Sequence, residues 1–241
     1  MRKSAVSTKT VRNPWAWIPS LYFAQGLPYV AVMTLSVIMY KRMGISNTDI
    51  ALYTSWLYLP WVIKPLWSPV VDMIATKRLW TVVMELLIGI GFAGVAFTLP
   101  TSFFFSASLG VFWLVAFLSA THDIAADGFY MLALDSHQQS FYVGIRSTFY
   151  RISTIVGQGA LVMLAGYLEE RWQPAPGESM DYTPIAWMAV MGALSIFFVI
   201  ISVYHRFILP RPKSDCGVKG LTIRNAGKEF IGTFASFFRK P

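Results

Sequence analysis

Six long apolar stretches constrain this chain more than any other feature of its sequence. They cover residues 15–40, 50–71, 79–99, 103–134, 141–168 and 184–209. Each is long enough to cross a hydrocarbon layer of about 30 Å as a helix, which needs roughly 20 residues. Since 55% of the residues are apolar and only 13% are charged, the chain has too few polar side chains to cover a soluble globule. We therefore predict an all-α membrane protein.

The distribution of Lys and Arg predicts how these spans are oriented. Basic loops stay on the cytoplasmic side of a membrane. With the N-terminus inside, the inner segments hold 14 Lys and Arg residues, whereas the outer segments hold three. We therefore predict a bundle of six transmembrane helices over residues 15–209, with both termini in the cytoplasm. Because each trio of spans starts on the opposite side from the other, the bundle is a candidate for a 3+3 inverted repeat.

Two cytoplasmic segments flank the predicted bundle, a basic tail at residues 1–14 and a linker at residues 210–241. Over residues 221–238, apolar residues recur near helical spacing among basic ones, which predicts an amphipathic helix on the inner leaflet. The alternative is a disordered tail. The surplus positive charge, formally +8, lies in these segments, so the predicted partner is the lipid bilayer with its anionic head groups. No nucleic-acid partner is implied.

The sequence lacks the motifs of an enzyme. His122, His137 and His205 lie in different predicted elements and have no metal-ligand spacing. No Gly-rich phosphate loop or nucleophile elbow is present. The single cysteine, Cys216, lies in the predicted linker, so the sequence offers neither a disulfide framework nor a cysteine metal site. We predict no catalysis, no metal site and no cofactor.

Six ionisable residues lie inside the apolar spans, three of each sign. They are Lys64, Glu85, Asp123, Asp127, Arg146 and Arg151. A charge inside a membrane is costly unless it is paired or faces water, so such residues usually mark a pathway or a gate. At 1.5 Å per residue, all six fall toward the cytoplasmic ends of their spans. This pattern predicts a protein that moves a solute across the membrane.

The charges near the inner ends predict a cytoplasmic gate, because opposite charges on adjacent helices can lock the helix ends together and separate when the helices part. The predicted gate residues are Lys64, Asp72, Asp123, Asp127 and Arg146. Lys64, Ser68 and Asp72 are four residues apart, so they are expected to share one helix face. The alternatives are static ion pairs that fix helix packing and, for Lys64 and Asp72, snorkelling to the membrane interface.

Three carboxylates within the spans are candidates for proton coupling, because a buried carboxyl group can take up a proton near neutral pH. They are Asp123 and Asp127, which we prefer, and Glu85. Protons are therefore a predicted second partner of this chain.

Polar side chains follow one face of the fifth span and one face of the first. Ser147, Arg151, Thr154 and Gln158 recur at steps of four, three and four, and Tyr22, Gln25 and Tyr29 recur at three and four. Such faces are expected to line a cavity for a small-molecule substrate. The predicted substrate-binding residues are Gln25, Tyr29, Arg151 and Gln158, of which Arg151 can meet a carboxylate or phosphate. The alternative is hydrogen bonding and aromatic packing between helices.

Two spans have an unusual composition. The sixth has almost no polar residue before Tyr204 and His205, so we predict that it faces lipid as scaffold. The second contains Pro60, Pro65 and Pro69. In a membrane helix such breaks are tolerated where neighbours or water satisfy the freed backbone groups, and they act as bending points or simple kinks.

Three local segments are distinctive beyond their composition. They are Gln25-Gly26-Leu27-Pro28, Lys64-Pro65-Leu66-Trp67-Ser68-Pro69 followed by Asp72, and Asp123-Ile124-Ala125-Ala126-Asp127-Gly128. Together they resemble the AmpG-type muropeptide permeases of the major facilitator superfamily, which are similar to the acetyl-CoA transporters of eukaryotic organelles. The chain departs from the expected pattern at Ser68 and Ala75, which replace glycines, and at His122, which replaces a glutamine.

The resemblance implies the N-terminal half of a major facilitator fold, with a missing C-terminal half of six helices as its partner. It also implies proton-coupled import of muropeptide or another amino-sugar solute across a bacterial inner membrane, with the substrate near the midplane between the halves. The alternatives are a transporter of sugars or of acyl-CoA and, from a different class, a membrane scaffold or receptor that transports nothing.

Overall fold

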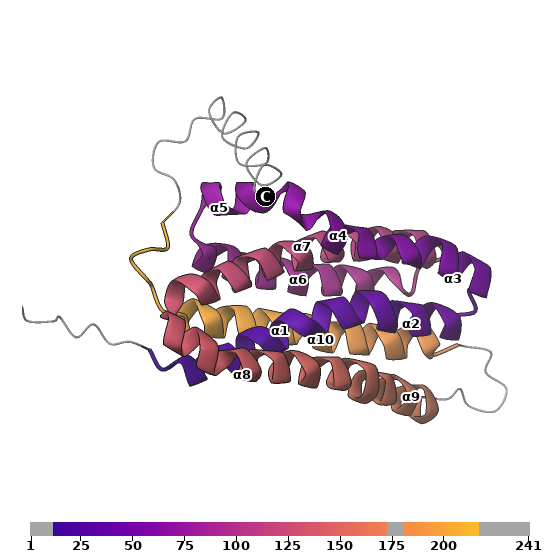
Figure 1. Cartoon of the computed structure of the whole chain (residues 1–241). Helices are drawn as coiled ribbons and strands as arrows, with labels where there is room; N and C mark the ends of the chain where they lie inside the picture. Colours follow the sequence, from indigo (N-terminus) through magenta and orange to yellow (C-terminus); the bar gives the residue numbers. More distant parts are fainter. Residues whose placement is uncertain (1–11, 173–180, 217–241) are drawn as a thin grey trace, which may run out of the picture.

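The computed structural model describes residues 12–172 and 181–216, and every regular element in these ranges is helical. Five helical runs are long and apolar enough to cross a membrane: Pro14–Arg42, Lys77–Thr98, Phe104–Ala133, Ser136–Arg171 and Thr183–Ile208. They lie side by side along one long axis (Figure 1). The predicted all-α, multi-pass class is confirmed at this level.

The first and fourth runs each contain a π-helical segment. The first consists of η1 (Pro14–Ala16), α1 (Ile18–Val30), η2 (Ala31–Leu35) and α2 (Ser36–Arg42). The fourth consists of α8 (Ser136–Ile155), η5 (Val156–Leu161) and α9 (Val162–Arg171). The two π-helical segments, η2 and η5, contact each other. Since π-turns inside helices are rare and often occur at functional sites, this contact draws attention to the side of the bundle where α1 meets α8.

The predicted second span, residues 50–71, is interrupted in the structure, as its prolines indicated. The structure has five short elements here: α3 (Asn47–Thr54), η3 (Ser55–Tyr58), α4 (Leu59–Ile63), η4 (Lys64–Leu66) and α5 (Ser68–Ile74). Pro60, Pro65 and Pro69 each lie in the first turn of one of the last three elements. Proline has no backbone N–H to continue a helix, and it is tolerated at a helix start. The segment nevertheless follows the length of the bundle against α7 (Figure 1).

Two groups of helices make up the bundle. On one side α6 (Lys77–Thr98) packs against both α7 (Phe104–Ala133) and α10 (Thr183–Ile208). On the other side α1 packs against α8 and, less extensively, α7. Glycines permit close approach in both groups, because an added Cβ at Gly91 would lie 2.5 Å from Val115 and one at Gly157 would lie 2.6 Å from Val30.

The predicted sixth span, α10, has both a buried face and the exposed apolar face expected of a lipid-facing helix. One face of α10 is buried against α6, where the Ser202 hydroxyl donates to the Val82 carbonyl at 2.8 Å and His205 is inaccessible to solvent. The opposite face is apolar and exposed at Ile200 and Phe207. The hydropathy of the span predicted its exposed apolar face but gave no sign of the polar contacts on its buried face.

The described chain begins and finishes at the same end of the bundle (Figure 1). This is the end at which α6 and α8 begin and α7 and α10 finish. The predicted basic tail, apart from residues 12–14, and the predicted amphipathic helix at 221–238 lie outside the described residues.

Candidate functional site

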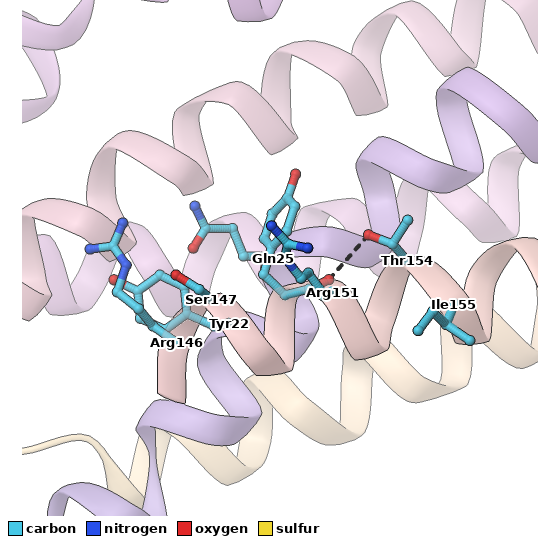
Figure 2. Close-up of a pocket in the computed structure, with 8 residues that line it drawn as sticks. Tyr22, Gln25, Arg146, Ser147, Arg151, Thr154 and Ile155 are labelled. Carbon is cyan, nitrogen blue, oxygen red and sulfur yellow. Dashed lines mark hydrogen bonds between the residues drawn. The ribbon is translucent and has the colours of Figure 1, made fainter. Parts of the chain in front are cut away.

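A cavity of about 610 Å³ lies between α1 and α8. Its walls are Tyr22 and Gln25 from α1, and Arg146, Ser147, Tyr150, Arg151, Thr154 and Ile155 from α8. Figure 2 shows the α8 side chains following one face of the helix opposite Tyr22 and Gln25. The steps of three and four along the sequence produce this face, since such residues are neighbours on a helix surface. The polar stripe predicted in the fifth span therefore does line a cavity at Ser147, Arg151 and Thr154.

The cavity brings together two of the four predicted substrate-binding residues. Gln25 and Arg151 are in its wall. Gln25 is buried, and its Oε1 atom has no hydrogen-bond partner among the described residues. Tyr29 instead packs edge-on against Trp61, with ring centroids 5.2 Å apart, and Gln158 is exposed on η5. The observed cavity thus has an amide side chain and a guanidinium group in its wall, which are suited to a polar ligand.

An ion pair between α7 and α8 lies beside this cavity. Arg146 Nη2 is 3.3 Å from Asp127 Oδ1, and the Tyr22 hydroxyl donates to the same oxygen at 3.1 Å. The guanidinium carbon also lies 4.7 Å from the centroid of the Tyr22 ring and 5.1 Å from that of Tyr130. The side chains of Arg146 and Asp127 are 28% and 36% exposed. Water can therefore replace either partner when the helices separate.

The other predicted gate residues form separate contacts. Lys64 Nζ is 3.7 Å from Asp123 Oδ2 and links the broken segment to α7. Asp72 pairs with Lys77 across the turn from α5 to α6. Because the helix is interrupted at Trp67, Lys64 and Asp72 do not share one continuous helix face. The structure thus divides the predicted line of charges into three pairs.

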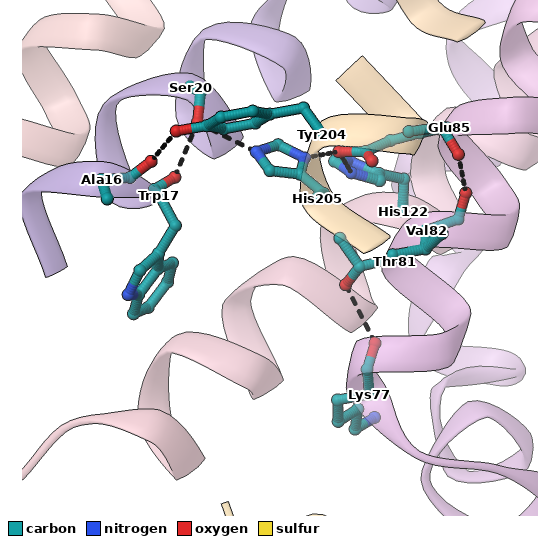
Figure 3. Close-up of polar contacts among 11 residues, drawn as sticks. Ala16, Trp17, Ser20, Lys77, Thr81, Val82, Glu85, His122, Tyr204 and His205 are labelled. Carbon is teal, nitrogen blue, oxygen red and sulfur yellow. Dashed lines mark hydrogen bonds and ion pairs between the residues drawn. The ribbon is translucent and has the colours of Figure 1, made fainter. Parts of the chain in front are cut away.

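A second charged cluster is buried on the opposite side of α7. Glu85 Oε1 lies 2.7 Å from His205 Nδ1 and 3.3 Å from His122 Nε2. His205 Nε2 lies 2.9 Å from the Ser20 hydroxyl, which extends the cluster to α1 (Figure 3). The Glu85, His122 and His205 side chains are at most 1% exposed. The cluster therefore joins four helices away from water.

Sequence reasoning missed both histidines of this cluster. His205 lies 120 residues from Glu85 and His122 lies 37 residues from it. Helical spacing relates residues on one helix, whereas these contacts depend on how three helices are placed. The available signal was the cost of a polar group in an apolar span, which predicts that each must find a partner without showing which one.

The opposite end of the bundle has its own ion pair. Arg42, at the end of α2, pairs with Glu169 of α9. Glu169 Oε1 also accepts a hydrogen bond of 2.9 Å from Trp187 Nε1 of α10. Charged contacts therefore link helices at both ends of the molecule. Within residues 12–172 and 181–216, no cluster of three or more His, Cys, Asp or Glu residues is arranged to hold a metal ion.

Known proteins share sequence with this chain. The BT1 family matches residues 23–174. An uncharacterized protein of Schizosaccharomyces pombe is 28% identical over 166 residues, which cover 63% of this chain and 31% of that protein. The putative transporter AmpG 4 of Rickettsia conorii is 24% identical over 235 residues, 91% of this chain and 51% of the relative. The anhydromuropeptide permease of Escherichia coli (strain K12) is 28% identical over 160 residues, which cover 63% of this chain and 31% of that permease. The chain spans between about a third and a half of the length of these relatives.

Proposed function

Since this chain belongs to the BT1 family, we propose that it is the N-terminal half of a secondary active transporter of the major facilitator type. Two of its relatives are named a putative transporter and a permease, which confirms the predicted resemblance to AmpG-type permeases. The observation that carries the proposal is the polar cavity between α1 and α8, bordered by an ion pair that water can reach. We place the protein in a bacterial inner membrane, with residues 50–71 as the second of its six spans.

The proposed cargo is a muropeptide or another amino-sugar solute. Arg151 would bind a carboxylate of the cargo, because its guanidinium can engage two oxygens at once. Gln25 would accept a hydrogen bond from an amide or hydroxyl group through Oε1, which is buried without a partner here, once the amide turns toward the cavity. Tyr29 and Gln158 would contact the cargo only in another conformation, since neither lines the cavity here. The E. coli relative is named for its transport of anhydromuropeptides, which supports this class of cargo.

Alternating access would use the ion pairs as a gate. The Asp127–Arg146 pair borders the cavity, and the Lys64–Asp123 pair joins α7 to the broken segment. The Asp127–Arg146 pair can exchange a protein partner for water, so opening it costs little. Asp123 is buried, so opening its pair with Lys64 costs more unless the carboxyl group takes up a proton. The open side of the cavity would face a second bundle of six helices, and the 3+3 inverted repeat remains part of this proposal.

Proton coupling is proposed at Asp123 and Asp127. Each holds a basic residue of another element, so protonation of the carboxylate would release that residue and favour opening. Asp123 Oδ1 has no partner among the described residues and is free to accept a proton. Glu85 remains a third candidate, but two imidazole groups and complete burial favour a role in holding the helices together.

Uptake by the full-length protein in proteoliposomes tests the proposed cargo. With an inward proton gradient, labelled anhydromuropeptide should accumulate, and Arg151→Gln should reduce its uptake at least tenfold if two charge-assisted hydrogen bonds are lost. Arg171→Gln, which removes the same charge from the far end of α9, should leave uptake unchanged. Uptake of a labelled disaccharide without a carboxylate tests whether the carboxylate of the cargo is needed. If it is, the disaccharide should accumulate less than the anhydromuropeptide.

A second candidate cargo is acyl-CoA, because Arg146 and Arg151 both line the cavity and could bind its phosphates. Labelled acetyl-CoA is therefore included in the same uptake experiment. Accumulation of acetyl-CoA alone would replace the proposed muropeptide cargo. If none of the labelled solutes accumulates or exchanges, the chain is better described as a scaffold or receptor.

A further inference from the structure

A second and larger pocket lies at the end of the bundle where α6 begins and α10 finishes. It has a volume of about 870 Å³. Its lining includes five basic residues: Arg12, Arg78, Arg206, Arg211 and Lys213. The remaining lining residues are apolar: Ala133, Phe207, Leu209, Pro210 and Pro212. The pocket is distinct from the cavity between α1 and α8, since the two share no residue.

The walls of this pocket are fixed by hydrogen bonds to the start of α6. The Arg78 guanidinium donates to the Leu209 carbonyl at 3.2 Å and also to the Arg206 carbonyl. The backbone N–H groups of Lys77 and Arg78 donate to the Asp215 carboxylate at 2.6 and 3.0 Å. These contacts hold the segment after α10 against α6. The pocket is therefore a built feature of the fold.

The positive charge of the pocket is not neutralised by the described parts of the chain. None of its five basic residues forms an ion pair among residues 12–172 and 181–216. The guanidinium groups of Arg12, Arg206 and Arg211 lie close enough to Arg78 to repel its charge. Asp215 is the nearby acid, and it is engaged by two backbone N–H groups.

The chain segments that adjoin the pocket in sequence also carry an excess of positive charge. Residues 1–11 contain three Lys and Arg residues and no acid, and residues 217–241 contain five Lys and Arg residues and one acid. Four arginines and a lysine around one pocket match the oxygens of a phosphate group, which arginine can bind through two parallel hydrogen bonds. The chemistry therefore selects a phosphate-bearing anion from outside the chain.

An apolar stripe leads from the bilayer into the same pocket. Ile196, Ile200, Val203 and Phe207 recur at steps of four, three and four on α10, and each is more than half exposed. Phe207 belongs both to this stripe and to the pocket wall. A soluble phosphate would use only the basic half of this arrangement. An amphiphile would use both, with its acyl chains on the stripe and its phosphate among the arginines.

We propose that the basic pocket formed by Arg12, Arg78, Arg206, Arg211 and Lys213 binds the phosphate of an anionic phospholipid whose acyl chains lie along the exposed stripe of α10. Basic pockets near the ends of membrane helices bind such head groups. The site ties the lipid to the segment that follows α10. It is independent of the cargo and of the coupling ion.

Native mass spectrometry of the delipidated full-length protein tests this site directly. Titration with phosphatidylglycerol should show one tightly bound lipid, whereas phosphatidylcholine and inorganic phosphate should bind at least tenfold more weakly. The Arg206→Gln/Arg211→Gln double variant should raise the Kd for phosphatidylglycerol about tenfold, because both side chains are exposed basic groups near the membrane surface. These substitutions keep the backbone carbonyl that Arg78 binds, so the pocket wall should persist.

Two matched controls make the result specific. Arg171→Gln removes a charge at the other end of the bundle and should leave the Kd unchanged. Phe207→Ala should weaken phosphatidylglycerol binding severalfold, whereas Phe97→Ala, which changes an equally exposed phenylalanine on α6, should not. Wild-type affinity of the double variant, or an equal loss in Arg171→Gln, would overturn the site. Equal affinity for inorganic phosphate would overturn the choice of a lipid and leave a site for a soluble anion.

Discussion

A carboxylate contacts basic side chains on both sides of α7, but water reaches the contact only on the side of the cavity. On the cavity side, Asp127 pairs with Arg146 in a contact that is about one-third exposed. On the buried side, Glu85 contacts His122 and His205 with no access to water. An exposed pair contributes little to stability and can exchange partners, whereas removing one member of a buried pair leaves an uncompensated polar group. We therefore expect the Asp127–Arg146 pair to open and close as a gate, and the Glu85 cluster to hold α6, α7 and α10 together throughout.

The largest expected effect is on stability and comes from the buried cluster. Glu85→Ala should lower the free energy of unfolding by about 3–5 kcal/mol, because two buried imidazole groups lose their shared acceptor. Asp127→Ala should cost less than about 1 kcal/mol, because water reaches Arg146. Thermal and denaturant unfolding of the detergent-purified protein measures both. Equal losses in the two variants would remove the distinction between the two sides.

The second test concerns the close contact between η5 and α1. It shows whether the helices on the cavity side are tightly packed independently of their charged residues. Gly157→Ala should lower the free energy of unfolding by about 1–3 kcal/mol, because the new Cβ would lie 2.6 Å from Val30, the last residue of α1. Gly159→Ala is the matched control on the same π-helical segment, since its Cβ would meet nothing within 4 Å. If the two alanine variants unfold alike, α1 and η5 are less closely packed than described here.

The smallest expected effect compares one hydroxyl on each side. Ser20→Ala removes the partner of the His205 ring and should cost about 1–3 kcal/mol, because a buried nitrogen loses its hydrogen bond. Tyr22→Phe removes a donor to Asp127 and should cost at most about 1 kcal/mol, because water in the cavity can replace it. Unfolding measurements on both variants rank them, and the reverse order would contradict the burial assigned to the two clusters.

The sequence predicted features that depend on one helix and missed those that depend on several. Length and hydropathy located five of the six spans, and helical spacing placed Arg151 and Ser147 on the cavity face. The pairing of Asp127 with Arg146 also agrees with the predicted gate. The partners of Glu85 required the packing of α6, α7 and α10, which no local pattern encodes. At residues 50–71 the prolines indicated the breaks that the structure shows, because proline lacks the backbone N–H that continues a helix.

The central claim is that the charges on the cavity side carry proton coupling and that the buried cluster does not. Its direct test is the ratio of proton-driven accumulation to counterflow exchange of labelled anhydromuropeptide in proteoliposomes with the full-length protein. Asp123→Asn and Asp127→Asn should lose accumulation and keep exchange. Glu85→Gln should keep the wild-type ratio in the fraction that folds. Loss of accumulation with intact exchange in Glu85→Gln, together with a wild-type ratio in both aspartate variants, would contradict the account.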